Sequence, residues 1–375
     1  MTYRTRVVLA PDKFKGSLAA PEVAAALAAG IARVAPGAQV RQVPVADGGD
    51  GMVEAFAAAG WERVVVSAPG PTGEPSTAVY AVQGSTAVVE LAAAVGLVKL
   101  RGRLEPLRAN TFGLGVVIAH ALDRGAREIV LGLGGSASTD GGAGMLRALG
   151  LRLLDAAGAE VADGSSVEVL RSVVSVDRAG LHPGVSQARF VLACDVDNPL
   201  LGPAGAVAVY APQKGASALQ MVQLEAALGN WAAVLGKGYA EIGGAGAAGG
   251  AGFGALAVLG ARVRSGIEVL LELLEFPTLL LTADLVVTGE GSLDHQSMHG
   301  KAPVGVAAAA KRAGVPVLAA VGRTLLSPGE IHAAGFAAAY SLSDLEPNAA
   351  TSIANANALL QRVGEQIATD YLTDR

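Results

Sequence analysis

The apolar run Ala-Asp-Leu-Val-Val at residues 283–287 constrains the fold of this chain more than any other segment. A short apolar run without alternation is typical of a strand that is buried on both faces of a parallel sheet. Glycines end the run, and the polar segment TGEGSLDHQSMHGK (288–301) then leads into a stretch of Ala and Val with helical character. This order predicts a parallel α/β fold, because parallel strands need helical crossovers.

The same style opens the chain and returns at its end, whereas the middle differs. Short strands separated by Gly-Pro and Gly-Ser turns at 63–67, 76–82 and 86–91 predict hairpins. Alternating strands and helices are expected at 6–10, 21–34, 39–45, 52–59, 303–313, 316–321, 337–341 and 350–370.

This contrast predicts two domains. We expect residues 1–65 and 283–375 to form one discontinuous parallel α/β domain, with a second α/β domain, residues 66–282, inserted into it. The length of 375 residues allows two domains of ordinary size.

Composition limits the function classes. The net charge is −5 and only 4% of residues are aromatic, so nucleic-acid binding has little support. The single cysteine, Cys194, allows no internal disulfide and fits a reducing, cytoplasmic location. We expect its side chain to be a small, buried residue that fills space in the core. The uncharged segment 242–261 is too rich in glycine for a membrane helix, so we predict a loop that enters a buried helix.

Acids, lysines and glycines gather where the predicted strands end. APDKFKGSL (10–18) and PVADGGDGM (44–52) follow the first two strands, and ACDVDNPLLGP (193–203) follows a later one. Ligands of parallel sheets bind at the carboxyl ends of the strands, so these loops predict a catalytic edge. APQKGA, with Lys214, is interpreted as another polar turn after a strand.

The segment LGLGGSASTDGGAGM (131–145) predicts an anion site. Closely spaced glycines let backbone N–H groups point at one anion ahead of a helix at 143–149. The segment also fits the dinucleotide pattern G-x-G-x-x-A, but that pattern should open directly into a helix, and here a polar stretch intervenes. We favour phosphate binding; a structural glycine turn is the alternative. No Walker P-loop and no zinc-binding histidine pattern occurs.

Five of these segments, in chain order, resemble motifs of the glycerate kinase type 1 family: 10–18, 44–52, 131–145, 193–203 and 288–301. The resemblance runs from about residue 6 to the end of the chain. The resemblance implies ATP-dependent phosphorylation of D-glycerate to 2-phosphoglycerate with Mg²⁺, and no nucleic-acid or membrane partner. It implies a flavodoxin-like parallel α/β domain made from both ends of the chain, an inserted α/β domain, and an active site in the cleft between them. The oligomeric state is left open.

The resemblance also carries over site residues by position. The catalytic candidates are Asp195, Asp47, Asp294 and Lys15. The substrate candidates are Ser17, Asp50 and Asn198, and the metal candidates are Asp47, Asp294 and Glu290. The candidates for binding the nucleotide are Gly134, Gly135, Ser136, Asp140, Gly289, Glu290, Gly300 and Lys301.

Alternatives remain for the activity and the roles. The same kinase could give 3-phosphoglycerate, and a regulator could bind a phosphometabolite without catalysis. About six carboxylates among the glycine loops favour the enzyme, because they would repel an anionic ligand without a metal. Phosphoryl transfer to an alcohol needs a carboxylate near the attacking hydroxyl to act as the base. Among the candidate carboxylates, we take Asp195 for this role.

Overall fold

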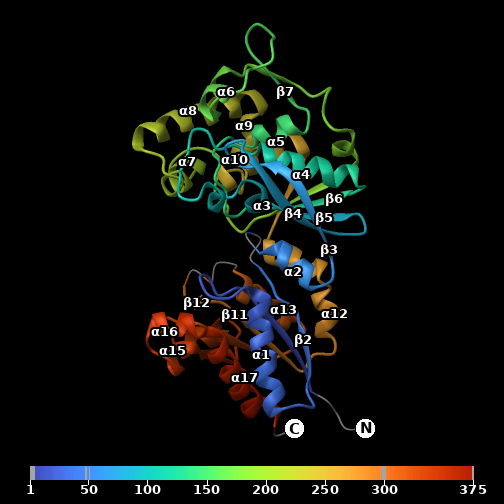
Figure 1. Cartoon of the computed structure of the whole chain (residues 1–375), viewed down its shortest axis with the longest axis vertical. Coiled ribbons are helices and arrows are strands. Elements are labelled where there is room, and N and C mark those ends of the chain that lie inside the picture. The colour runs from blue at the N-terminus through green and yellow to red at the C-terminus, as the bar shows by residue number, and fades with distance from the viewer. Residues whose placement is uncertain (1–4, 47–48, 50, 296, 298–300, 374–375) are drawn as a thin grey trace. The chain divides into compact units, whose positions relative to one another are not determined.

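The structure is a computed structural model that describes residues 5–46, 49, 51–295, 297 and 301–373. The chain divides into two compact units, and Figure 1 shows the elements of each. Unit 1 comprises residues 1–47, 54–60 and 267–375, and unit 2 comprises residues 48–53 and 61–266. The sequence placed the boundaries near 65 and 283. Helices α11 (Gly266–Leu273) and α12 (Phe276–Leu280) therefore fall almost entirely in unit 1.

Unit 1 is built on a five-stranded parallel sheet in the order β15-β13-β11-β1-β2. Helices α1 and α17 pack together against one face of this sheet, and α13 contacts β1, β11 and β13 on the other. The elements are β1 (Arg6–Pro11), α1 (Ala20–Val34), β2 (Gln39–Gln42), β11 (Leu285–Gly289), β12 (Ser292–Leu293), α13 (Ala302–Arg312), β13 (Val317–Val321), β14 (Arg323–Thr324), α14 (Pro328–Ala333), β15 (Ala338–Ser341), α15 (Leu342–Leu345), α16 (Ala349–Ala354) and α17 (Ala356–Leu372).

The central strand β11 confirms the interpretation of the apolar run. All five residues of β11 are buried, and it lies between β1 and β13. The order of strands along the chain reverses between β1 and β11, because β2 lies on one side of β1 and all later strands lie on the other. A crevice for a ligand is expected at such a switch point, outside the carboxyl ends of the strands.

Unit 2 is built on a six-stranded mixed sheet in the order β10-β9-β6-β5-β4-β3. The predicted hairpins are present, since β3, β4 and β5 pair in antiparallel fashion, while β5, β6, β9 and β10 are parallel. Helix α2 (Met52–Ala58) is divided between the units. The elements of unit 2 are β3 (Glu62–Pro69), β4 (Pro75–Gln83), β5 (Thr86–Glu90), α3 (Leu91–Val95), α4 (Phe112–Asp123), β6 (Glu128–Gly132), α5 (Ala143–Ala148), β7 (Arg152–Leu154), α6 (Ser166–Ser172), β8 (Ser175–Asp177), β9 (Arg189–Ala193), α7 (Ala206–Tyr210), α8 (Ala218–Leu235), α9 (Lys237–Ala240), α10 (Ala247–Leu259) and β10 (Arg262–Arg264), with 3₁₀ turns at Leu97–Leu100, Pro183–Gln187 and Pro212–Lys214.

The uncharged segment 242–261 folds as predicted. A glycine-rich loop leads into α10, whose residues from Gly249 onward are buried in the core of unit 2. Within the described residues, no helix combines the length and the apolar character that a membrane crossing requires.

Candidate active site

In unit 1, the loops after β1 and β11 meet at the switch point. The N–H of Asp12 donates to the carbonyl oxygen of Gly289 at 2.8 Å, so the two strand ends are tied together. The side chains that follow them, Asp12 and Glu290, are each 8% exposed. Lys301 Nζ lies 3.7 Å from Glu290 Oε2 and brings a positive charge to this edge. Glycine is needed at position 289, because a Cβ there would lie 1.7 Å from the carbonyl oxygen of Ala320.

Three further predicted residues of unit 1, Lys15, Ser17 and Asp294, lie on the same two loops. Lys15 is exposed, and Asp294 is half-buried with its Oδ1 accepting the N–H of Ser297 at 3.3 Å. The hydroxyl of Ser17 donates to the carbonyl oxygen of Ile353 at 3.0 Å, which gives this side chain a structural contact with the C-terminal segment. The predicted residues Asp47, Asp50 and Gly300 lie outside the described residues.

In unit 2, the loop after β6 has an accessible end and a buried end. Gly134 is half-buried and Gly135 is exposed, but residues 136–146 are all buried. The main chain beside Ser136 is fixed, since the carbonyl of Gly135 accepts the N–H of Leu97 at 2.9 Å and the N–H of Ala137 donates to the carbonyl of Val95 at 3.1 Å. The main chain exposed at the surface of this loop is therefore that of Gly134 and Gly135, at the edge of Ser136.

The buried end of this loop binds an anion that belongs to the chain itself. The carboxylate of Asp140 accepts the N–H groups of Thr111, Gly142 and Gly144 at 2.8, 3.2 and 3.0 Å, and the Thr111 hydroxyl at 2.7 Å. Burial raises the pKa of Asp140, and these donors oppose the shift. The sequence analysis assigned N–H groups of this segment to a phosphate; in this half of the loop the carboxylate of Asp140 occupies them.

The interpretation of APQKGA was wrong. Lys214 is the last residue of a 3₁₀ turn that follows helix α7, not a strand, and Lys214 is only 2% exposed. Its Nζ donates to Ser136 Oγ at 2.7 Å and to the carbonyl oxygen of Ser138 at 2.5 Å. The preceding run AVAVY alternates small and β-branched residues as strands do, but packing against α8 and α10 accommodates it as a helix.

The loop after β9 carries the other predicted residues of unit 2. Asp195 is exposed, and its Oδ1 accepts the N–H of Gly266 at 2.9 Å. Both ends of the Asn198 amide are engaged: Nδ2 donates to the carbonyl of Ala204 at 2.8 Å, and Oδ1 accepts the hydroxyl of Tyr210 at 2.5 Å. Because β6 and β9 are parallel, Asp195 and the glycine loop lie at the same edge of the sheet.

Sequence reasoning missed Glu90. This carboxylate ends β5, is 6% exposed, and accepts the N–H groups of Gly51 and Val53 at 2.9 and 2.8 Å. It therefore anchors the end of the segment PVADGGDGM. The sequence does contain a signal for Glu90, namely a charged residue at the end of an apolar strand. Such a residue lies at the carboxyl end of the strand, where ligands of parallel sheets bind, just as the glycine loops do.

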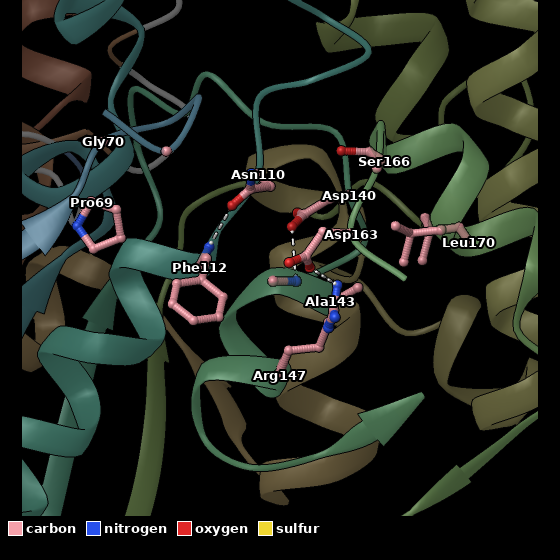
Figure 2. Close-up of a pocket in the computed structure, with 14 residues that line it drawn as sticks. Pro69, Gly70, Asn110, Phe112, Asp140, Ala143, Arg147, Asp163, Ser166 and Leu170 are labelled. Carbon is pink, nitrogen blue, oxygen red and sulfur yellow. Dashed lines mark hydrogen bonds and ion pairs between the residues drawn. The ribbon is translucent and has the colours of Figure 1, made fainter. Parts of the chain in front are cut away.

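A cavity of about 330 Å³ lies beside the buried end of the glycine loop (Figure 2). Asp140 lies in its wall, together with the Arg147–Asp163 ion pair, whose charged atoms are 2.8 Å apart. The ring of Phe112 lies at its edge and is partly exposed. Asp140 is the one predicted site residue among the side chains that line this cavity.

The structure bears on two possible cofactors, a dinucleotide and a metal ion. Helix α5 begins at Ala143, after the polar stretch that follows the G-x-G-x-x-A segment 132–137, so the dinucleotide pattern lacks the helix that it must open into. Among the described residues, no group of three or more acidic, histidine or cysteine side chains forms a ready metal cage. Mg²⁺ retains several waters and needs only one or two carboxylates, and Glu290 and Asp294 supply ligands of that type.

Comparison with known proteins gives consistent matches. A family model described as the glycerate kinase family matches residues 7–372. Glycerate kinase of Bacillus subtilis (strain 168) is 43% identical over 345 residues, and glycerate 2-kinase of Escherichia coli (strain K12) is 42% identical over 346 residues. Each alignment covers 90% of both chains. A crystal structure assigned as a glycerate kinase 2 of Salmonella typhimurium LT2 is similar with a TM-score of 0.86 and 38% identity, covering 98% of each chain.

Proposed function

This chain belongs to the glycerate kinase family, and we propose that it transfers the terminal phosphoryl group of ATP to the 2-hydroxyl of D-glycerate. It is a kinase that acts on glycerate, and a kinase family implies ATP as the donor. The observation that carries the proposal is the family match over residues 7–372, which spans all five motifs. The glycerate 2-kinase of Escherichia coli favours the 2-position. A cytoplasmic location remains a prediction from the single cysteine.

We propose a flavodoxin-like fold for unit 1. Its strand order, read as 2-1-3-4-5, is the flavodoxin-like order, with the switch point between the first and third strands. Asp12, Lys15, Glu290 and Asp294 follow those two strands and are the residues of unit 1 best situated for a charged ligand. We also propose that unit 2 is a domain inserted into this fold. This is supported by the fact that unit 1 is made of separate segments of the chain.

The proposed roles follow from charge and chemistry. Lys15 and Lys301 supply positive charge for phosphate oxygens, and Gly134, Gly135 and Ser136 supply the accessible part of the glycine loop. Mg²⁺, held by Glu290 and Asp294 with Asp47, would neutralise charge on the transferred phosphoryl group. Asp195 accepts the proton of the attacking hydroxyl, because it is exposed and fixed by the N–H of Gly266.

A coupled assay of ADP release tests the activity. With ATP, Mg²⁺ and D-glycerate, we expect turnover that depends on all three, with L-glycerate and lactate as comparison substrates. Phosphorus NMR of the product should show 2-phosphoglycerate. A 3-phosphoglycerate signal would overturn the position of transfer, and saturable binding without turnover would indicate a regulator instead.

A further inference from the structure

Lys214 is a buried amine that neither the sequence motifs nor the proposed roles account for. It is 2% exposed, and its Nζ is held by Ser136 Oγ at 2.7 Å and by the carbonyl of Ser138 at 2.5 Å. Burying an amine costs free energy that its hydrogen bonds offset only in part, so its presence beside a glycine loop requires an explanation. The residues that Lys214 contacts, Ser136 and Ser138, follow immediately after the accessible end of the loop, Gly134 and Gly135.

A second element holds the same loop further along the chain. The carbonyl of Gly249 accepts the N–H of Gly141 at 3.0 Å. Gly249 has φ +68°, and a Cβ at that position would lie 2.0 Å from the carbonyl oxygen of Ser138. Its neighbour Ala248 has φ +54°, a strained conformation for a residue with a side chain. The buried end of the loop is thus fixed by main-chain packing, whereas the side chain of Ser136 is fixed by Lys214.

We propose that Lys214 is a positioning residue that holds the side chain of Ser136, beside the exposed Gly134–Gly135 turn, in the orientation that receives a phosphate group of ATP. This inference rests on the proposed kinase function. Lys214 acts from behind the loop, through Ser136, and does not itself touch the reacting atoms. Its charged form adds positive potential beneath the turn, which favours an anionic ligand.

The geometry makes this arrangement sensitive to pH. Burial lowers the pKa of Lys214 to about 7, and the nearby Asp140 carboxylate opposes the shift. Among the described residues, Asp140 is the charged group that acts on this amine. As the pH rises through about 7, Lys214 loses its proton and the positive potential at the turn disappears. Affinity for ATP should therefore fall as the pH rises above 7.

The test compares two lysines with similar hydrogen bonds. Lys99 Nζ also donates to a serine hydroxyl, Ser76 Oγ at 2.9 Å, and to a backbone carbonyl, that of Thr77 at 2.8 Å, but both partners belong to β4 and not to the glycine loop. At pH 6.5, Lys214→Met should raise the KM for ATP about tenfold, the size expected for a hydrogen bond to a charged group, with kcat changed less than threefold. It should also flatten the dependence of this KM on pH between 6 and 9. Lys99→Met should leave both unchanged. A wild-type KM and pH profile in Lys214→Met would overturn the proposal.

Direct titration of Lys214 separates this inference from the activity itself. The wild-type protein is labelled with ¹³C at lysine Cε, and the resonance that disappears in Lys214→Met is assigned to Lys214. If that variant does not fold, the lysine resonance that titrates near pH 7 is followed instead. The pKa measured from this resonance should rise on addition of ATP. This follows because ligand and proton binding are reciprocally linked. An unchanged lysine pKa with ATP bound, or no ATP binding by calorimetry, would overturn the role of Lys214 whether or not glycerate is phosphorylated. An active enzyme with an unresponsive lysine would leave the kinase function intact.

Discussion

The loops after β11 and β6 have similar sequences, but the structure uses their charges differently. Each follows a buried parallel strand whose last residue is glycine, Gly289 or Gly132, and each contains an acid before a helix. After β6, Asp140 is 2% exposed and accepts four hydrogen bonds from the chain. After β11, Asp294 is half-buried and the side chain of Lys301 is 34% exposed. A glycine and an acid thus follow the end of each strand, and we propose that the more accessible Asp294 serves a ligand whereas the buried Asp140 serves the fold.

The largest effect that this comparison predicts is on stability in the loop after β6. Asp140→Ala leaves the buried N–H groups of Thr111, Gly142 and Gly144 without their acceptor. Removing one partner of a buried charged network typically costs about 3–5 kcal/mol. Urea denaturation followed by circular dichroism measures the free energy of unfolding. Asp163→Ala is the matched control, since that side chain is 95% exposed and should cost less than about 1 kcal/mol. Equal losses in the two variants would show that the hydrogen bonds to Asp140 stabilise the fold no more than an exposed ion pair does.

The next effect is on catalysis from the exposed loop after β9. Asp195→Asn keeps an oxygen for the N–H of Gly266, so the free energy of unfolding should change by less than about 1 kcal/mol. Loss of a general base should lower kcat about 10²-fold, with a smaller change in KM. Asp197→Asn, on the same exposed loop, is expected to retain most of the activity. Near-normal kcat in Asp195→Asn would transfer the role of base to another carboxylate.

The third effect concerns the pH dependence of stability. The folded pKa of Lys214 is about 7, far below the usual value for lysine, so between pH 7 and about 10 the unfolded chain binds one more proton at this residue than the folded chain does. Stability therefore rises with pH across this window, by at most about 1.4 kcal/mol per pH unit, and this gain is lost as the pH falls from about 10 to 7. The difference in unfolding free energy between wild type and Lys214→Met should vary with pH accordingly. A constant difference from pH 7 to 10 would show that Lys214 titrates alike in both states.

The sequence predicted the scaffold better than the use of its loops. The apolar run of β11 and the hairpins of β3, β4 and β5 follow from local patterns of apolar residues and turns, and both are present. The expected last helix is divided into α16 and α17 around Asn355, and β2 ends earlier than expected, at Gln42. Such ends depend on caps and neighbours that periodicity does not encode.

The sequence predicts where a site lies on each sheet, but it does not assign a role to each residue there. Acids at strand ends identified the edge of each sheet, because that follows from topology alone. The contact of Lys214 with Ser136 joins segments 78 residues apart, and the donors on Asp140 include Thr111, 29 residues away. No local pattern specifies such contacts. Which anion a glycine loop binds depends on what else is buried beside it, and only the folded chain settles that question.

The smallest predicted effect tests the ligand-facing side of the comparison. Asp294→Asn retains an oxygen that can accept the N–H of Ser297, so the fold of the loop after β11 should persist and the free energy of unfolding should change by less than about 1 kcal/mol. If Asp294 is one of only two or three carboxylates on Mg²⁺, its loss should raise the Mg²⁺ concentration for half-maximal activity several-fold, with activity recovering at saturating Mg²⁺. The measurement is initial rate against Mg²⁺ at saturating ATP and glycerate. Asp344→Asn, exposed in the same unit, is the control and should show the wild-type requirement. Activity that is lost at every Mg²⁺ concentration would instead place Asp294 at the reacting hydroxyl, and the loop after β11 would then supply the base that we assign to Asp195.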